Sequence, residues 1–344
     1  MANTLERDVG IDVAKAGLIS MMLFYHSFAN AQVASTLEVD PNFNINRWMG
    51  LVTGSFPYLM GFLIGFRYLG DVTKGFIEIQ RLVVRASKLI IFFLAVNVLL
   101  MILGPSLDKL TIPLPNTPDL QDILLANSGS VAYDLLMPLG EVALIGAVVV
   151  FARMHIRSDL FLLSILTIVA IILAQSGSVL LLYLACGIVG LTLGSVSGRP
   201  VVSQVLKRYW VIGLLGFVPG VILAISQTNG PDNALLYLAS VAGLFFGFHN
   251  LGRFAVLRSD GTTSRIVKLF ARSSLMIYIV HIPILKVLTK FSGQIFTETD
   301  LWLAFSVFAV FMFVTMGALA HFVDLYRPKF DQGLSRLNIL RRAG

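Results

Sequence analysis

The stretch that decides the fold is GIDVAKAGLISMMLFYHSF, from Gly10 to Phe28. It has the apolar character of a membrane helix, but Asp12, Lys15 and His26 lie inside it. A charged side chain at the centre of a bilayer costs about 2.5–3.5 kcal/mol even on the most lenient scale. These side chains therefore predict a helix face that contacts protein or water instead of lipid.

The three polar residues share one side of the expected helix. About three turns and ~16 Å of rise separate Lys15 from His26, so both point in the same direction. Asp12 lies one turn before Lys15, near the same face. The face thus carries a charged pair near one end and an imidazole near the other. Alternatively, Asp12 and Lys15 lie at the membrane interface and His26 only bonds a neighbouring helix.

The rest of the chain has the composition of a membrane protein. Of 344 residues, 56% are hydrophobic and 13% are charged, and the mean hydropathy is +0.83. No polar segment is long enough to fold alone, so residues 1–344 are expected to form a single transmembrane domain. The first residues, MANTLERD, lack the positive charge of a signal peptide, and we expect the segment to be retained as the first span.

Apolar runs of about 20 residues, enough to cross ~30 Å of hydrocarbon, recur along the sequence. They predict an all-α polytopic membrane protein with about ten transmembrane helices, joined in one place by the short QSGS segment from Gln175 to Ser178. The predicted spans are 11–30, 49–67, 86–104, 134–152, 159–175, 177–196, 209–227, 234–252, 272–289 and 301–322.

The basic residues are sorted between the two sides of the predicted bundle. With both termini in the cytoplasm, 21 of the 26 Lys and Arg residues lie on the cytoplasmic side, and Arg47, Lys109, Lys286 and Lys290 lie outside. This sorting follows the positive-inside rule and predicts cytoplasmic termini. It also explains the net charge of +7 without a nucleic-acid partner. The single cysteine, Cys186, gives neither a disulfide framework nor a Cys/His metal spacing, so we expect no metal.

Five motifs, in order along most of the chain, resemble the membrane-bound acyltransferase-3 family. Asp12, Lys15 and His26 match the family's opening, in which Arg follows Asp after three residues and His after fourteen. The later segments are similar to the family's aromatic-Leu-Ser-Gly-Phe-Leu-Ile, Arg-x-x-Arg, OpgC-like fourth-span and Ser-aromatic-Leu-x-His-x-Pro regions. They are FPYLMGFLIGFRYL (Phe56–Leu69), QRLVVRASKLI (Gln80–Ile90), DLLMPLGEVALIG (Asp134–Gly146) and RSSLMIYIVHIPIL (Arg272–Leu285).

The sequence departs from the family at three of these places. Lys15 stands where the family has Arg, which removes a bidentate contact with an anion. Met60 replaces the usual Ser. The basic pair is either Arg81 with Arg85, which have one extra residue between them, or Arg85 with Lys88.

The resemblance implies an integral membrane O-acyltransferase of the bacterial inner membrane. Members of the family take an acyl group, such as acetyl or succinyl, from cytoplasmic acyl-CoA and place it on a hydroxyl of an extracytoplasmic glycan or glycolipid. Carried over to this sequence, the expected catalytic residues are His26 and Asp12. The expected acyl-CoA contacts are Lys15, Arg81, Arg85 and Lys88, and the expected substrate contacts are Glu141, His281 and Tyr278.

The residues themselves permit this chemistry. A basic cluster at the cytoplasmic end of the third span can hold CoA phosphates, although such clusters also fix topology or bind anionic headgroups. A buried neutral imidazole such as His26 can accept the proton of a hydroxyl. His281 alternatively bonds a helix carbonyl freed by Pro283.

Other polar residues and other function classes stay open. Asp134 and Glu141 either satisfy each other's surroundings or contact substrate, His249 and Asn250 are expected at the membrane interface, and Arg272 is a further candidate for the CoA-facing cluster. A transporter or lipid flippase also needs ten spans with interior polar residues, but it works without acyl-CoA. A non-catalytic assembly or sensor subunit needs no buried imidazole.

Overall fold

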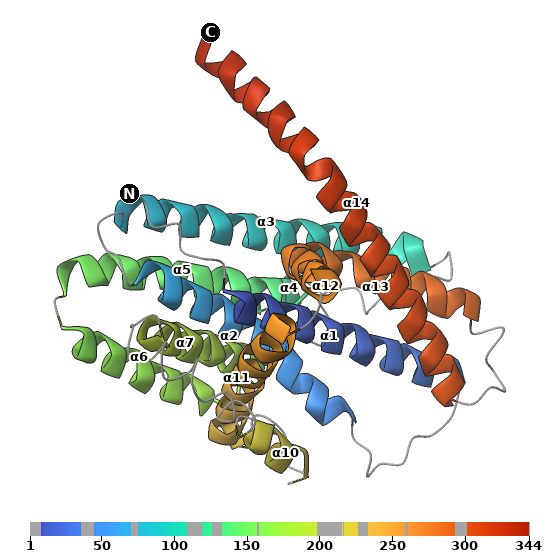
Figure 1. Ribbon diagram of the computed structural model, residues 1–344, viewed down its shortest axis with the longest axis horizontal. Coiled ribbons are helices and arrows are strands. Elements are labelled where there is room, and N and C mark those ends of the chain that lie inside the picture. The colour runs from blue at the N-terminus through green and yellow to red at the C-terminus, as the bar shows by residue number, and fades with distance from the viewer. Residues whose placement is uncertain are drawn as a thin grey trace. The chain divides into compact units, whose positions relative to one another are not determined.

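The computed structural model describes residues 8–35, 45–69, 75–108, 119–125, 133–156, 158–197, 215, 217–225, 233–258, 261–292 and 301–343. Within these residues every regular element is helical (Figure 1). The helices are α1 (Val9–Ser35), α2 (Ile45–Tyr68), α3 (Gly75–Asp108), α4 (Leu120–Leu125), α5 (Leu136–His155), α6 (Asp159–Ala174), α7 (Val179–Ser197), α10 (Phe217–Ile225), α11 (Ala234–Arg258), α12 (Gly261–Arg272), α13 (Ser274–Ser292) and α14 (Leu301–Ala343).

The all-α prediction is confirmed, and each predicted span coincides at least in part with a helix. The span predicted at 209–227 lies partly outside the described residues, where α10 covers its second half. Among the described residues, five helices are long and apolar enough to cross a membrane, namely α1, α3, α5, α7 and α14. The bent pair of α12 and α13 makes a sixth if it is counted as one span. The length and composition of these helices are therefore compatible with a multi-pass membrane protein.

The joint between α6 and α7 lies where the sequence predicts it. α6 begins after Ser158, whose hydroxyl accepts a hydrogen bond from the Phe161 N–H, as an N-cap residue does. It ends at Ala174, and α7 begins at Val179. Gly177 has a φ of 75° in this turn, a conformation that a residue with a side chain rarely adopts. The glycine thus allows two apolar helices to follow each other with almost no linker.

The chain divides into two compact units. Unit 1 comprises Met1–Val39 and Ala255–Gly344, and it holds α1, α12, α13 and α14. Unit 2 comprises Asp40–Phe254 and holds the helices from α2 to most of α11. Unit 1 thus joins the two ends of the sequence.

In unit 2, α2 and α7 approach each other through glycines. A Cβ at Gly61 would meet the Gly187 carbonyl, and one at Gly190 would meet the Tyr58 carbonyl. Small residues allow helix backbones to come this close in a membrane, where close van der Waals packing drives association. Because Gly61 faces Gly187 and Gly65 faces Leu191, the two helices run in the same direction.

The second pair in unit 2 is α3 with α5, which lie side by side (Figure 1). Gly75 at the start of α3 meets Met154 near the end of α5, and the Phe92 ring lies 6.3 Å from the Tyr133 ring, just before α5. The two helices therefore run in opposite directions. α5 also packs on α2 and α7, with Gly146 against Ile64 and Gly187 against Val142.

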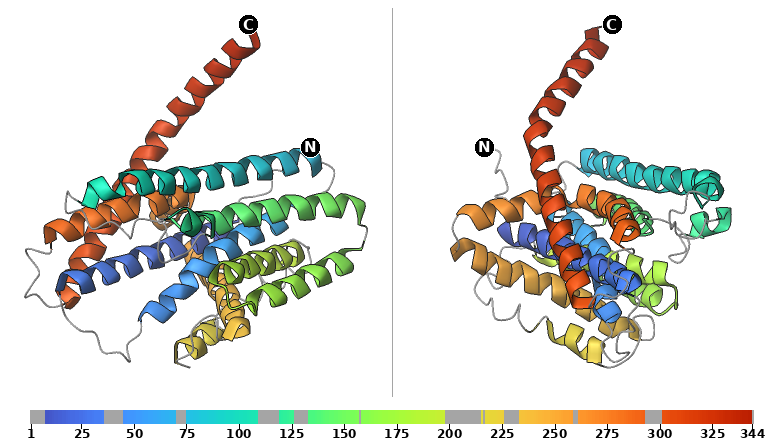
Figure 2. Two further views of the ribbon diagram at one scale, coloured as in Figure 1. Left: turned by 180° about the vertical axis from the view of Figure 1, so that it is seen from behind. Right: turned by 90° about the vertical axis from the view of Figure 1, so that its right-hand side faces the viewer.

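Unit 1 is built around α1, which packs on α12, α13 and α14. Aromatic rings join α1 to α14: the Phe24 and Phe313 ring centroids lie 4.8 Å apart, and those of Phe28 and Trp302 lie 6.0 Å apart. A later residue of α1 meets an earlier one of α14, so these helices run in opposite directions. α14 continues unbroken to Ala343 and is longer than the span predicted at 301–322 (Figure 2).

Candidate functional site

Two histidines from opposite ends of the sequence lie side by side in unit 1. The ring centroids of His26 on α1 and His281 on α13 are 4.9 Å apart, and the ring planes are tilted by 49°. The His281 side chain is fully buried, whereas His26 is partly exposed. Two of the residues singled out in the sequence therefore belong to one site.

The hydrogen bonds of His281 determine which of its ring nitrogens carries the proton. Nδ1 lies 2.7 Å from the Tyr278 carbonyl oxygen and 3.1 Å from that of Ile277. A carbonyl can only accept, so Nδ1 carries the hydrogen, and in the neutral ring Nε2 carries a lone pair. Nε2 is buried and has no hydrogen-bond partner among the described residues. A buried acceptor without a donor costs about 1–3 kcal/mol.

This geometry corrects one reading of His281. Pro283 lacks the N–H that would bond the carbonyl four residues earlier, which belongs to Ile279. The His281 ring instead contacts the carbonyls of Ile277 and Tyr278, and these are not the ones that the proline leaves free. The carbonyls that hold the His281 ring therefore belong to a part of the helix that does not need the histidine as a replacement hydrogen-bond partner.

A polar contact between Asn30, one turn after His26, and Thr289, about two turns after His281, fixes α1 against α13. The Asn30 side-chain amide donates to the His26 carbonyl at 2.7 Å, and the Thr289 hydroxyl donates to Asn30 Oδ1 at 2.8 Å. Because His26 meets His281 and Asn30 meets Thr289, α1 and α13 run in the same direction. This clamp sets the register that brings the two rings together.

Two tyrosines flank the histidine pair. The Tyr25 ring lies 4.9 Å from the ring of His26, and the Tyr278 ring lies 5.9 Å from that of His281. Tyr278, predicted as a substrate contact, thus belongs to this site, where its backbone carbonyl also orients His281. Sequence reasoning did not single out Tyr25.

Asp12 and Lys15 lie toward the other end of α1. Asp12 is buried and Lys15 is partly exposed. Because α1 is one continuous helix from Val9 to Ser35, the rise from Asp12 to His26 is about 21 Å. Asp12 thus contributes to the polar face of α1 at a distance from the histidine pair.

The predicted basic cluster forms a single stripe on α3 of unit 2. Residues 81, 85 and 88 lie within about 60° of arc on a continuous helix, so Arg81, Arg85 and Lys88 share one exposed face. Arg81 forms an ion pair with Glu78 at 2.8 Å. In the described part of the chain, no carboxylate pairs with Arg85 or Lys88. These two cations are therefore the members of the stripe that are open to an anionic ligand.

Glu141, on α5 of unit 2, has one carboxylate oxygen buried without a hydrogen-bond partner in the described residues. The Tyr58 hydroxyl, on α2, is likewise buried and has no hydrogen-bond partner in the described part of the chain. Asp134 accepts a hydrogen bond from the N–H of Leu135 at 2.9 Å. Glu141 stays a candidate substrate contact.

Three further polar residues have partners within the protein. His249 and Asn250, predicted at the membrane interface, are both buried, and His249 Nδ1 lies 2.9 Å from Asn250 Oδ1. Arg272, a candidate for the CoA-facing cluster, is 3.6 Å from Asp324 on α14. In the described residues no group of three or more His, Cys, Asp or Glu side chains is arranged to hold a metal ion.

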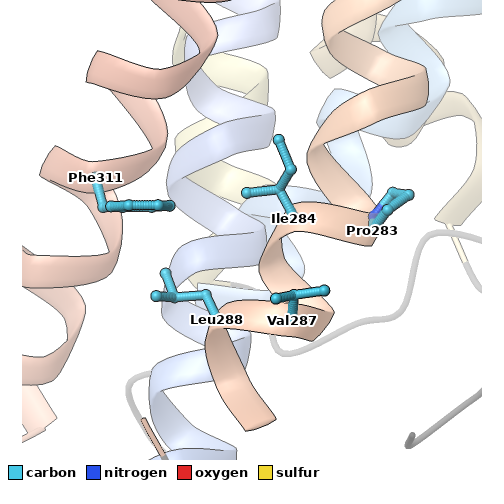
Figure 3. A pocket seen from close by; sticks show the side chains of 5 residues that line it. All are labelled: Pro283, Ile284, Val287, Leu288 and Phe311. Carbon is cyan, nitrogen blue, oxygen red and sulfur yellow. The ribbon is translucent and has the colours of Figure 1, made fainter. Parts of the chain in front are cut away.

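An apolar groove of about 350 Å³ lies between α13 and α14 of unit 1. Figure 3 shows its lining side chains, four from α13 and one from α14: Pro283, Ile284, Val287, Leu288 and Phe311. Its first residue, Pro283, follows His281 by two positions. No protein-family model, curated protein or solved structure matches this chain.

Proposed function

We propose that this chain is an integral membrane O-acyltransferase of a bacterial inner membrane. It moves an acetyl or succinyl group from cytoplasmic acyl-CoA to a hydroxyl of an extracytoplasmic glycan or glycolipid. The observation that carries the proposal is the pair of His26 and His281, in which a buried ring nitrogen has a lone pair and no donor among the described residues. The order of sequence motifs that resemble the acyltransferase-3 family supports the same assignment.

The reaction needs a proton acceptor beside the attacking hydroxyl. As the hydroxyl oxygen forms the new ester bond, the carbon–sulfur bond of the thioester breaks, and the CoA sulfur leaves as a thiolate. His26, the more exposed of the two rings, accepts the hydroxyl proton. The imidazolium formed in this way returns its proton to the thiolate or to water.

His281 acts through His26 as a positioning residue. Its Nδ1–H is held by backbone carbonyls, so its Nε2 lone pair can accept a hydrogen bond from the neighbouring ring. With rings 4.9 Å apart, a rotation of the His26 side chain brings a ring nitrogen within reach. This bond fixes the tautomer of His26 and stabilises its protonated form.

The donor is held at the basic stripe of α3. CoA carries phosphates, and Arg85 and Lys88 are exposed cations without a carboxylate partner in the described residues. Arg81 contributes less because Glu78 already neutralises it. Lys15, on the polar face of α1, is the further candidate for a donor contact.

The proposal includes ten spans with both termini in the cytoplasm. In that arrangement, α1 and α13 are the first and ninth spans and must run in the same direction, as must α2 and α7, the second and sixth. α3 and α5, the third and fourth, must run in opposite directions. The observed directions of these three pairs agree with the proposed order.

Arg85→Ala should weaken donor engagement. Losing a charge-assisted contact with a phosphate is worth roughly 1.5–3 kcal/mol, which is about a 10- to 100-fold rise in the apparent KM for acyl-CoA. Arg81→Ala should have a smaller effect because Arg81 is paired with Glu78. Steady-state kinetics in reconstituted vesicles measure both. The matched control is Arg67→Ala, because Arg67 is an exposed basic residue at the end of α2. If the alanine variants of Arg81, Arg85 and Arg67 raise the apparent KM equally, the stripe only fixes the topology and does not bind the donor.

Binding of acyl-CoA to the purified protein tests the proposed function. We expect acetyl-CoA or succinyl-CoA to bind in a saturable way and free CoA thiol to appear when an envelope glycan fraction is added. A transporter or flippase would move its substrate without acyl-CoA, and a sensor or assembly subunit would consume no thioester. A correctly folded protein that neither binds acyl-CoA nor releases CoA contradicts the proposal.

A further inference from the structure

α12 is amphipathic, with its cations on one side of the helix and its apolar side chains on the other. Arg265, Lys268 and Arg272 fall within about 60° of arc around the helix, counted at 3.6 residues per turn. The apolar side chains lie on the remaining circumference: Ile266, Val267, Leu269, Phe270 and Ala271. The spans predicted from the sequence leave residues 253–271 as a cytoplasmic connection without a helix of its own.

Only part of the apolar surface of α12 is covered by protein. Phe270 and Ala271 are buried, and α12 packs on α1, α13 and α14 within unit 1. Ile266, one residue after Arg265, is 53% exposed. An exposed isoleucine beside a row of cations is the arrangement of a helix that lies at a membrane surface, with its apolar side toward the acyl chains.

The direction of α12 agrees with this location. α12 and α13 are bent by 77° at Ser273, so a helix nearly perpendicular to α13 precedes it. α13 is an apolar helix of 19 residues, close to the length that crosses a bilayer. When α13 crosses the membrane, α12 lies close to the membrane plane.

The charges of α12 are not all used within the protein. Arg272 is 3.6 Å from Asp324, which ties the end of α12 to α14. Arg265 and Lys268 form no ion pair with any carboxylate in the described part of the chain. Arg265 is exposed and Lys268 is partly exposed, so both can reach a ligand outside the protein.

We propose that α12 is an interfacial helix whose Arg265 and Lys268 bind the headgroup phosphates of anionic phospholipids, while Ile266 enters the boundary between headgroups and acyl chains. Each cation near an anionic membrane surface contributes roughly fivefold to lipid affinity. The proposal does not depend on acyl transfer, since it rests on the geometry of unit 1 alone.

A charge-removal experiment on the full-length protein tests the lipid contact. The detergent-solubilised protein is titrated with phosphatidylglycerol, and unfolding on heating is followed by the loss of helical circular dichroism. We expect phosphatidylglycerol to raise the unfolding temperature, and Arg265→Gln with Lys268→Gln to shift the titration midpoint upward by roughly 30-fold. The control, Arg67→Gln with Arg153→Gln, removes the same charge from unit 2 and should leave the midpoint unchanged. Phosphatidylcholine and inorganic phosphate should have no effect.

A depth measurement keeps the proposal testable even if the charge variant folds poorly. Ile266→Cys is labelled with a nitroxide in lipid nanodiscs, where the buried Cys186 does not react. We expect the label to collide with dissolved oxygen more than with a water-soluble nickel chelate, as it would at the headgroup boundary. A label that is freely accessible to the nickel chelate overturns the proposal. Equal titration midpoints for the α12 variant and its control, or stabilisation by inorganic phosphate alone, also overturn it.

Discussion

Replacing His26 by Ala is expected to lower acyl transfer by about 10²–10⁴-fold, the usual contribution of general acid–base catalysis. Donor binding should be nearly unchanged, because Lys15 lies about 16 Å along α1 from His26. Folding should survive, since the substitution buries no new charge. Steady-state transfer and acyl-CoA binding, measured on the same purified protein, separate these effects.

His281→Ala tests whether the two rings act as a unit. Alone, it should lower turnover by about tenfold, because it removes one hydrogen-bond acceptor from His26. In the His26→Ala background it should cost nothing further, since residues that act through one another are not additive. His155→Ala, which removes an exposed histidine from α5, is the control and should retain activity. Independent, additive losses for His26 and His281 would show that the pair is not coupled.

Gly190→Leu is expected to disrupt unit 2. Even a Cβ at this position would overlap the Tyr58 backbone carbonyl, and backbone cannot yield as a flexible side chain does. Overpacking of a close contact costs typically 1–3 kcal/mol, and separating α2 from α7 costs more because the glycine contacts repeat along both helices. We expect a fall of several degrees or more in the unfolding temperature, measured with a thiol-reactive dye that reports exposure of the buried Cys186.

The matched control is a pair of alanine variants. Gly317 lies in α14, and the nearest atom to a Cβ built there is on Phe270 at 3.9 Å, an ordinary contact. Gly317→Ala should be neutral or stabilising because Ala favours helix over Gly by up to about 1 kcal/mol. Gly190→Ala should destabilise despite the same gain in propensity. Equal unfolding temperatures for the two alanine variants would show that α2 and α7 are not in close contact.

The helices could be predicted because their cause is local. A run of apolar residues must satisfy its backbone within itself in a membrane, so length and hydropathy find α1, α3, α5, α7 and α14 directly. α12 was missed because it is short and basic, and its apolar period was hidden within a charged connection. The extension of α14 was missed because a helix does not have to end where the hydrophobic run ends.

The candidate site was only partly visible in the sequence. The polar residues of α1 stand out because Asp12, Lys15 and His26 interrupt an apolar run. The contact between His26 and His281 depends on how α1 packs on α13, and no local period encodes such a pairing across the length of the chain. The orphan Nε2 of His281 depends on a rotamer and on two backbone carbonyls. The signals at His281 were the family-like segment around it and the proline two residues later, and the explanation through a freed carbonyl was wrong.

Mass spectrometry of the envelope glycans from cells that lack this gene, and that carry either the wild-type chain or His26→Ala, is the most direct test of acyl transfer at the histidine pair. We predict an acyl-sized mass increase on a glycan or glycolipid only with the wild-type chain, and the size of the increase identifies the donor. The His26→Ala protein should be present in the membrane at a normal level and leave the glycans unmodified. Identical glycan masses in all three strains would contradict acyl transfer, and full modification by His26→Ala would contradict the role of the histidine.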